Sequence, residues 1–475
     1  MTILPIDPAA NASPEALVGF LEGCRDGAAR AGRPSLVSIT IQVEDLDPLA
    51  VLESIFEPGE RHFYAERPSE GWAVAGAESA LTFSTSGPGR FGACQEFIDA
   101  ALADAVAVGD EAAAFGGPHF FGAFSFLDAV GADEPFEAAR LFVPRWQVAR
   151  RGGRTTAVAN LLVGGDAPVG PLASRVWRAH AKFRSFDFRP PDLPGGRPGA
   201  HSAVSERGGR LAYERTVGRA AGRIARGDFE KIVVARAKDV RAAGAFHPLR
   251  MLNGLRQRFP ECCAFSVANG RGQSFIGASP ERLLRVEGRV ALTEALAGSA
   301  GRGASASEDA ALGSRLLHSD KDLREQRIVL DAILRALEPL GLELRHPPRP
   351  LLRRLSNVQH LHTPVEAGLP EGVRLLDILG RLHPTPAVGG SPREAAVTAI
   401  GELEGFPRGL YGGALGWIDA RGSGEFVVGL RSALVDGTRA RMYAGAGIVA
   451  GSSPANEFLE TELKFRAMQD ALLGT

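Results

Sequence analysis

Three charged side chains share one face of a predicted helix near the C-terminal end of the sequence. Glu457, Glu460 and Lys464 are spaced at i, i+3 and i+7, which places them on a single stripe. The helix follows a glycine-rich strand, 445–449, whose main-chain amides can approach a ligand because no side chain intervenes. Such a stripe is ordinary on a solvated helix, but beside this strand it favours a site for a metal ion and a small dianionic substrate.

Two further residues could exchange protons with such a substrate. Lys231 begins a predicted strand rich in β-branched residues, and Glu281 opens another strand directly after Gly-Ala-Ser-Pro at 277–280. Together they are a candidate general base and general acid from neighbouring strands. Each also has an ordinary explanation, since a lysine at a strand end is usually a surface charge and a glutamate after a turn is usually solvated.

Glu325, on a predicted helix, offers another carboxylate. Its ordinary partner would be Lys321 at i−4, in a solvated pair that contributes little. It could instead bind the same metal ion as Glu460, because hard oxygen ligands from two separate helices suit Mg²⁺. His360 is more often a hydrogen-bonded core histidine than a ligand. The sequence contains no His/Cys cluster that indicates zinc and no Walker or Gly-x-Gly-x-x-Gly loop that indicates a nucleotide.

The elements that must position these residues change in character along the chain. Before residue 204, short apolar segments separated by turn signals predict an antiparallel meander, together with an N-terminal amphipathic helix and a helix over 92–108. The Pro/Gly-rich segment 188–204 is the best linker candidate.

From residue 208 the pattern sharpens. A helix over 210–228 is predicted to end at Gly227, with an inward face, and helices and antiparallel strands follow it. The residues of that inward face are Leu211, Val217, Ala221 and Ile224.

Bulk composition narrows the functional class. Among the 475 residues, 45% are hydrophobic and 23% charged, which is typical of a soluble globular protein. The net charge of −1 gives no reason to expect nucleic acid or an anionic membrane as a partner, and no apolar run approaches the roughly 20 residues of a membrane span. The N-terminus lacks a secretory pattern, and four cysteines without metal-type spacing indicate a reducing, cytoplasmic setting.

A series of motifs, in consistent order over about residues 205–470, resembles the chorismate-utilising enzymes. This family includes isochorismate, salicylate, anthranilate and aminodeoxychorismate synthases, and the N-terminal half of the chain is only loosely similar to it. The motifs are K-I-V-V-A-R (231–236), G-A-S-P-E-R-L (277–283), E-A-L-A-G-S (294–299), S-D-K-D-L-R-E (319–325), V-Q-H-L-H-T (358–363), H-P-T-P-A-V-G-G (383–390), G-A-G-I-V (445–449) and E-F-L-E-T-E-L-K (457–464).

The resemblance implies a role for each matching position. Lys231 would be the general base that activates water for attack at C2 of chorismate, and Glu281 the general acid that protonates the departing C4 hydroxyl. Glu325 and Glu460 would bind Mg²⁺, with Glu457 acting through water. The residues implied to contact the substrate are Gly298, Ser299, His360, Tyr411, Arg431, Gly445, Gly447 and Lys464.

The motifs also favour one reaction within the family. H-P-T-P-A-V-G-G is typical of isochorismate synthases, and Lys231 favours water over ammonia because anthranilate synthases carry glutamine there. We therefore expect an Mg²⁺-dependent isomerase that converts chorismate to isochorismate. A salicylate synthase, which goes on to eliminate pyruvate, is the alternative, and an ammonia-using synthase ranks third. One departure is Gln326, where the family often has histidine after the metal-binding glutamate.

The implied fold is α/β (α+β): one large domain of two packed antiparallel sheets with helices outside, as in anthranilate synthase component I. Residues 1–204 would form a variable N-terminal half and residues 205–475 the chorismate-binding catalytic region. We expect a cytoplasmic monomer or weak homodimer that binds chorismate and neither nucleic acid nor a membrane. Menaquinone, catecholate siderophore and salicylate supply all stay open as destinations of the product.

Overall fold

The computed structural model describes residues 2–3, 13–55, 57–110, 113–186, 188, 203–206 and 208–473. The segment predicted as a linker, 188–204, lies outside these residues except for Phe188, Ala203 and Val204. The prediction that the chain divides near residue 204 is therefore left open.

A sheet of 14 strands crosses the molecule and takes strands from both ends of the sequence. Neighbouring strands are antiparallel, except that β6 runs parallel to β1 and to β2. In spatial order the strands are β1 (Thr2–Ile3), β6 (Val106–Gly109), β2 (Ser35–Val43), β10 (Arg154–Val163), β9 (Trp146–Arg151), β4 (Trp72–Ala77), β3 (Arg61–Arg67), β13 (Cys263–Asn269), β14 (Gln273–Ser279), β23 (Ser432–Asp436), β24 (Arg439–Val449), β12 (Lys231–Arg241) and β11 (Ala203–Glu206), with β20 (Gly390–Ser391) also paired to β12.

A second sheet of 10 strands is antiparallel throughout the described residues. It packs against the first through buried aromatic and aliphatic side chains, and the rings of Phe63 and Phe121, one from each sheet, stack at 4.6 Å between centroids. The order is β17 (Glu343–Arg345), β19 (Val358–Gly368), β16 (Val290–Gly301), β15 (Arg282–Glu287), β22 (Gly424–Val428), β21 (Ala414–Asp419), β7 (His119–Phe124), β8 (Ala139–Val143) and β5 (Leu81–Thr85), with β18 (Leu351–Arg354) paired to β19. The predicted fold of two packed antiparallel sheets is confirmed.

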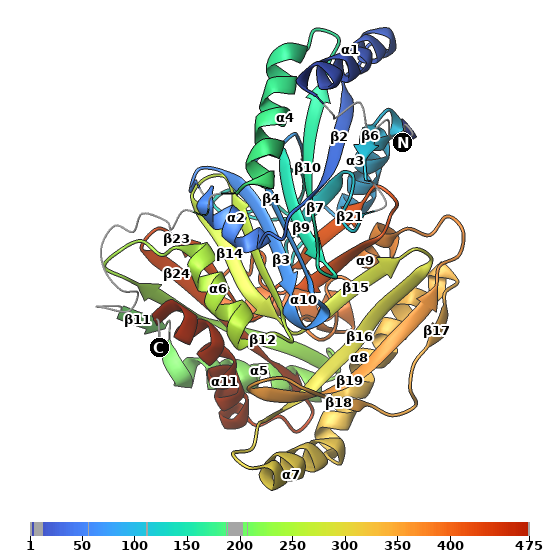
Figure 1. The fold of residues 1–475 in the computed structure, drawn as a ribbon. Helices are drawn as coiled ribbons and strands as arrows, with labels where there is room; N and C mark the ends of the chain where they lie inside the picture. The colour runs from blue at the N-terminus through green and yellow to red at the C-terminus, as the bar shows by residue number, and fades with distance from the viewer. Residues whose placement is uncertain are drawn as a thin grey trace.

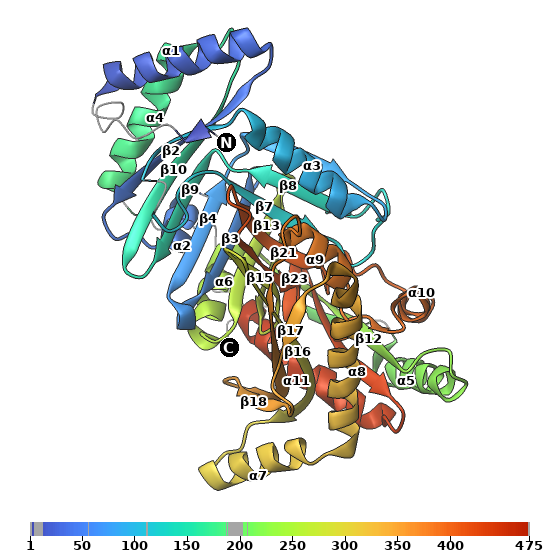
Figure 2. The ribbon, with the colours of Figure 1, turned by 90° about the vertical axis from the view of Figure 1, so that its right-hand side faces the viewer.

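Helices cover the outer faces of the sheets. In both views α1 and α4 lie with β2 and β10 at one end of the molecule, and α7 lies at the other (Figure 1, Figure 2). The helices are α1 (Pro14–Ala31), α2 (Pro48–Ser54), α3 (Arg90–Ala103), α4 (Val169–Arg184), α5 (Gly209–Ala225), α6 (Pro248–Arg258), α7 (Ala306–Leu317), α8 (Asp320–Leu337), α9 (Leu375–Leu382), α10 (Arg393–Glu404) and α11 (Pro454–Leu473).

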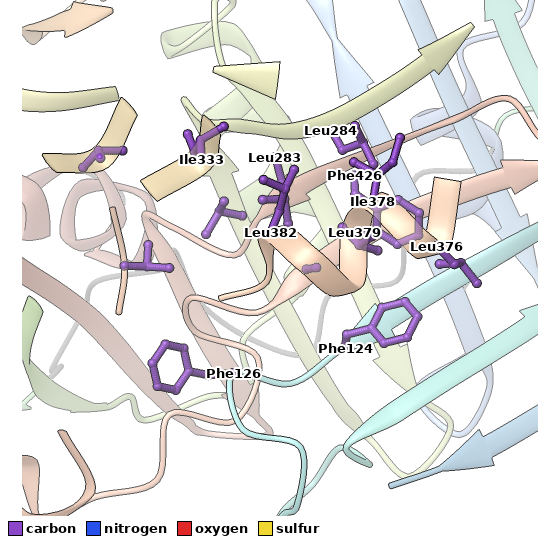
Figure 3. Close-up of a cluster of buried hydrophobic side chains, with 14 of the residues drawn as sticks. Phe124, Phe126, Leu283, Leu284, Ile333, Leu376, Ile378, Leu379, Leu382 and Phe426 are labelled. Carbon is purple, nitrogen blue, oxygen red and sulfur yellow. The ribbon is translucent and has the colours of Figure 1, made fainter. Parts of the chain in front are cut away.

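The largest core cluster joins the short helix α9 to the second sheet. Figure 3 shows Ile378 and Leu379 of α9 beside Leu283 and Leu284 of β15 and Phe426 of β22. All five side chains are almost fully buried. Burial of one such side chain contributes about 1.5–3 kcal/mol, so this cluster fixes the start of β15, next to Glu281.

Two sequence predictions are wrong in detail. The helix expected over 92–108 ends at Ala103, and Val106–Gly109 form β6, because their main chain pairs with β2. Leu211, expected to face inward, is 68% exposed. The buried face of α5 instead consists of Tyr213, Val217 and Ala220, at i, i+4 and i+7. The helix packs against β12 and β24 of the first sheet and against α11.

Candidate active site

One cavity, formed where β12, β16, β24 and helices α8 and α11 meet, encloses about 740 Å³ of empty space with its open mouth included. Of the 13 residues predicted for the site, 12 line it. They are Lys231, Glu281, Gly298, Ser299, Glu325, His360, Tyr411, Arg431, Gly445, Gly447, Glu460 and Lys464. A larger hollow beside Trp72 and Trp417 contains none of them.

Lys231 is a buried residue and not a surface charge. It begins β12 between β24 and β20, opposite Val449 and Ser391, and its side chain is 1% exposed. Its Nζ lies 2.9 Å from Oε1 of Glu325, which arrives from α8. The i, i+4 pairing of Glu325 with Lys321 is therefore not the partnership that forms.

Glu281 occupies the single position between Pro280 and β15. Its main chain is fixed by Ser279, whose Oγ accepts from the Glu281 amide at 3.3 Å, and by the Val428 amide, which donates to the Glu281 carbonyl at 3.2 Å. Burial, reinforced by the charge of nearby Glu294, raises the pKa of Glu281 to about 8. A carboxyl that keeps its proton at neutral pH is a candidate general acid.

The sequence predicted that the proton donor and acceptor come from neighbouring strands, and this is wrong. Strands β23 and β24 lie between β14, which leads to Glu281, and β12, which carries Lys231. The two side chains still line one cavity, and the positive charge of Lys231 acts on Glu281.

The stripe on α11 lies as predicted, but its two glutamates have different surroundings. Glu460 lines the cavity and pairs with Lys464 at 2.8 Å, whose Nζ also donates to the Gly445 carbonyl at 2.9 Å. Glu457 is buried behind it and pairs with Lys321 at 2.7 Å. Burial and the charge of Glu460 raise the pKa of Glu457.

Asp322 is a carboxylate at this site that the sequence reasoning missed. Burial, together with the charges of Glu325 and Glu460, raises its pKa, and it packs within 3.3 Å of the position a Cβ on Gly298 would take. The sequence contains a pattern that could have predicted it, because Asp322 and Glu325 have the same i, i+3 spacing on α8 that Glu457 and Glu460 have on α11. Two helices therefore bring matching acidic pairs to one corner.

His360 of β19 lines the cavity together with Gly298 and Ser299 of β16. A bulge in β16 lets Gly298 take a φ of 73°, a conformation that favours glycine, and directs its carbonyl at Nδ1 of His360, 3.2 Å away. Ser299 Oγ lies 3.0 Å from the same nitrogen, and Nε2 faces Arg431 at 3.4 Å. Burial and the charge of Arg431 hold the pKa of His360 well below its usual value, so the ring is neutral. Because the guanidinium of Arg431 can only donate to Nε2 and the Gly298 carbonyl can only accept from Nδ1, the proton is assigned to Nδ1.

Arg431 brings a buried positive charge to the cavity. It has a φ of 46°, rare for a residue with a side chain, and its guanidinium contacts Cys262 Sγ at 3.8 Å and Asn357 Oδ1 at 3.5 Å. Neither partner is a carboxylate, so within the described residues this guanidinium has no ion pair, while burial lowers its pKa. A substrate carboxylate would supply the missing anion.

Glycines of β24 let other groups approach closely. A Cβ at Gly445 would lie 2.9 Å from the Tyr411 hydroxyl. One at Gly447 would collide with the Glu325 carboxylate and come within 3.1 Å of Lys231 Cε. The Lys231–Glu325 pair therefore requires glycine at position 447.

Comparison with known proteins agrees with this site. The family model described as "Chorismate binding enzyme" matches residues 20–473. The chain belongs to this family. The salicylate biosynthesis isochorismate synthase of Pseudomonas aeruginosa is 38% identical over 461 residues, which cover 96% of this chain and 94% of that protein.

Two further family members extend the comparison. Isochorismate synthase MenF of Bacillus subtilis is 32% identical over 448 residues, covering 92% of this chain and 94% of that protein. The solved structure of MenF, the menaquinone-specific isochorismate synthase of Escherichia coli, superposes with a TM-score of 0.76 and 27% identity, covering 95% of this chain and 99% of that one. The similarity spans both halves of the chain.

The carboxylates at this corner fit a metal ion of the kind that the family implies. Glu325 and Glu460 offer hard oxygen donors from two helices on one cavity wall, a set that suits Mg²⁺ with water completing its shell. Each is paired with a lysine here, and the described part of the chain contains no group of three His, Cys, Asp or Glu side chains preassembled around a common point.

Gln326 stands where members of this family often have a histidine, directly after the metal-binding glutamate. Its amide nitrogen donates to the Ala295 carbonyl and to Thr363 Oγ1, both at 3.0 Å, and it does not line the cavity. The residue ties α8 to β16 and β19.

Across the described residues, no helix is long and apolar enough to cross a membrane.

Proposed function

We propose that this protein is an isochorismate synthase, an isomerase that converts chorismate to isochorismate and needs Mg²⁺. The observation that carries the proposal is a buried lysine and a buried, protonated glutamate on the walls of one cavity. Two relatives that the chain matches over nearly their full length are named isochorismate synthases, which supports the same reaction.

The reaction exchanges one hydroxyl for another. Water attacks C2 of the ring, the ring double bonds shift, and the C4–O bond breaks as the hydroxyl leaves. Lys231, after it has released the proton that its ion pair with Glu325 implies, takes a proton from the attacking water, and Glu281 gives its proton to the departing oxygen. The two side chains therefore exchange protonation states in one turnover and are restored by proton exchange with solvent, so that substrate and product are isomers.

The surroundings of Glu281 suit it to the part of the acid. Burial and the charge of Glu294 favour the protonated Glu281, which has to donate. A pair of titratable groups with separated pKa values is the general requirement for acid and base chemistry at one pH. General acid or base assistance typically contributes about 10²–10⁴-fold each.

The substrate is a dicarboxylate, and the cavity supplies opposite charges for it. Arg431 and Lys464 would bind one carboxylate region, with His360 and Ser299 beside it. Glu325 and Glu460, with Asp322 and Glu457 behind, would hold Mg²⁺, which when bound offsets the charge of a substrate carboxylate. The Gly445 and Gly447 main chain would lie against the ring.

Product analysis tests the proposal. Purified protein, chorismate and Mg²⁺ should give isochorismate, resolved by chromatography, without pyruvate. Salicylate with an equal amount of pyruvate would instead establish a salicylate synthase, and anthranilate or aminodeoxychorismate with ammonia present would establish an amine-using enzyme. Either result overturns the proposal.

We further propose a cytoplasmic location and a monomer or weak homodimer, as expected from the sequence. Size-exclusion chromatography with light scattering tests the second point, and a stable tetramer would contradict it.

A further inference from the structure

Two motif positions have no role in the reaction described above. Glu294 begins the E-A-L-A-G-S motif on β16, and His362 lies in V-Q-H-L-H-T on β19. Neither lines the cavity, yet the side chain of Glu294 is only 7% exposed. A buried carboxylate without a full set of partners is costly, so its contacts should explain why it is there.

Glu294 is held by three donors from three different strands. Arg353 of β18 donates from Nη1 to both carboxylate oxygens at 2.8 Å, and His362 Nε2 lies 2.8 Å from Oε2. The third donor is the main-chain amide of Arg282, 2.7 Å from Oε1. Burial alone would raise the pKa of Glu294, but the hydrogen bonds from His362, Arg353 and this amide hold it at about 2, so the carboxylate is charged.

The Arg282 amide matters because it belongs to the peptide that follows Glu281. A second hydrogen bond fixes the same stretch, since Thr293 Oγ1 donates to the Leu283 carbonyl at 2.7 Å. By contrast, no side-chain hydrogen bond to the Glu281 carboxyl exists within the described residues. Its position therefore depends on the main chain that Glu294 secures.

We propose, building on the assignment of Glu281 as the general acid, that Glu294 is its positioning residue. The carboxylate of Glu294 anchors the Glu281–Arg282 peptide and places a fixed negative charge behind the acid. A negative charge favours the neutral form of a nearby carboxyl. Arg353 and His362 are required because they keep Glu294 charged in a buried place.

Other charges face Glu281 and set the sign of the expected effect. Glu294 on β16 raises its pKa, whereas Lys231 on β12, Arg353 on β18 and Lys464 on α11 lower it. Glu294→Gln removes the group that opposes these three cations and leaves Arg353 uncompensated. Both changes lower the pKa of Glu281.

The experiment measures kcat/KM for isochorismate formation against pH for wild type and Glu294→Gln. The alkaline limb of the profile is the fall in kcat/KM as Glu281 loses its proton. In Glu294→Gln its midpoint should lie about one pH unit lower than in wild type. The ratio of variant to wild-type rate should then fall about tenfold between acidic and alkaline pH. A uniform loss at every pH, without displacement of the limb, would overturn the proposal.

Glu425→Gln is the matched control. Glu425 is a buried glutamate on β22, 4% exposed, and it pairs with Arg67 at 3.2 Å and with the Arg282 side chain at 3.1 Å instead of the Arg282 amide. It is not among the charges that act most strongly on Glu281. Its alkaline limb should stay at the wild-type position, and an equal displacement in this variant would contradict a specific role for Glu294.

Two measurements keep the test decisive if Glu294→Gln does not fold or if the enzyme makes another product. Arg353→Gln removes a cation, so its alkaline limb should move up, and a downward movement would refute the charge argument. The carboxylic acid band of Glu281, identified by its loss in Glu281→Gln, can be titrated by infrared spectroscopy without substrate. A lowered midpoint in Glu294→Gln supports the positioning role even where isochorismate is not formed, and an unchanged midpoint refutes it.

Discussion

Substitution of Gly447 by alanine tests the geometry of the site without removing any functional group. Gly447 is paired in regular register with Val233 and is not among the residues with positive φ, so alanine is compatible with the main chain. The new methyl group would collide with the Glu325 carboxylate and lie 3.1 Å from Lys231 Cε. Both members of the buried ion pair would have to move.

The size of the effect follows from that collision. The Glu325 carboxylate must move by about 1 Å to reach an ordinary contact distance. Overpacking of this kind costs about 1–3 kcal/mol of stability, and misplacement of a catalytic group by about 1 Å can cost about 10²-fold in rate. We therefore expect a folded protein whose kcat/KM for chorismate is about 100-fold lower.

Initial rates of isochorismate formation, with circular dichroism as the folding check, measure both quantities. Gly368→Ala is the control, because this strand glycine of β19 also lacks a positive φ and a Cβ there meets nothing within 4 Å. It should retain wild-type activity. Wild-type kcat/KM in a folded Gly447→Ala variant would refute the placement of Glu325 against Lys231.

Three other predictions concern the same cavity. Lys231→Ala should fold yet lose about 10²–10⁴-fold in kcat, because the variant lacks the group proposed to take the proton from water; retention of activity in a rate assay would exclude Lys231 as the base. Since Glu281 has to be protonated to act, and burial with Glu294 raises its pKa to about 8, kcat/KM should fall as pH rises through that value; a pH profile flat to pH 10 would contradict the assignment. Removal of divalent cations by EDTA should abolish turnover and added Mg²⁺ should restore it; full activity in chelator, after the metal content is checked by atomic absorption, would show that Glu325 and Glu460 have another use.

Local sequence patterns predicted most of the fold because they report local physics. The β-branched residues within 35–43 form β2, and Gly152 and Gly153 form the turn that joins β9 to β10, which fits the antiparallel meander expected there. The helix expected over 92–108 was wrong because the strand at 106–109 depends on pairing with β2, more than sixty residues earlier. Leu211 was wrong because α11, from the far end of the chain, determines which face of α5 is covered.

For the candidate site, too, local patterns predicted some features and contacts between distant segments determined the others. Helical spacing alone placed Glu457, Glu460 and Lys464 on one stripe. Residue chemistry made Lys231, Glu281 and Glu325 candidates, and the family resemblance supplied their roles and the remaining positions. Neither could show that Glu325 pairs with Lys231 and that Lys321 pairs with Glu457, because these contacts join elements far apart in the sequence. The Glu294 network is likewise invisible in the sequence, since its donors come from three strands that only the sheet brings together.

The most direct test of the central claim follows the oxygen atoms. Chorismate turned over in H₂¹⁸O by the wild-type protein with Mg²⁺ should give isochorismate that carries one ¹⁸O at C2, read by mass spectrometry, with no pyruvate released. Isochorismate without the label, or label-free salicylate together with pyruvate, would contradict a reaction in which Lys231 activates water on one side of the ring while Glu281 protonates the oxygen that leaves.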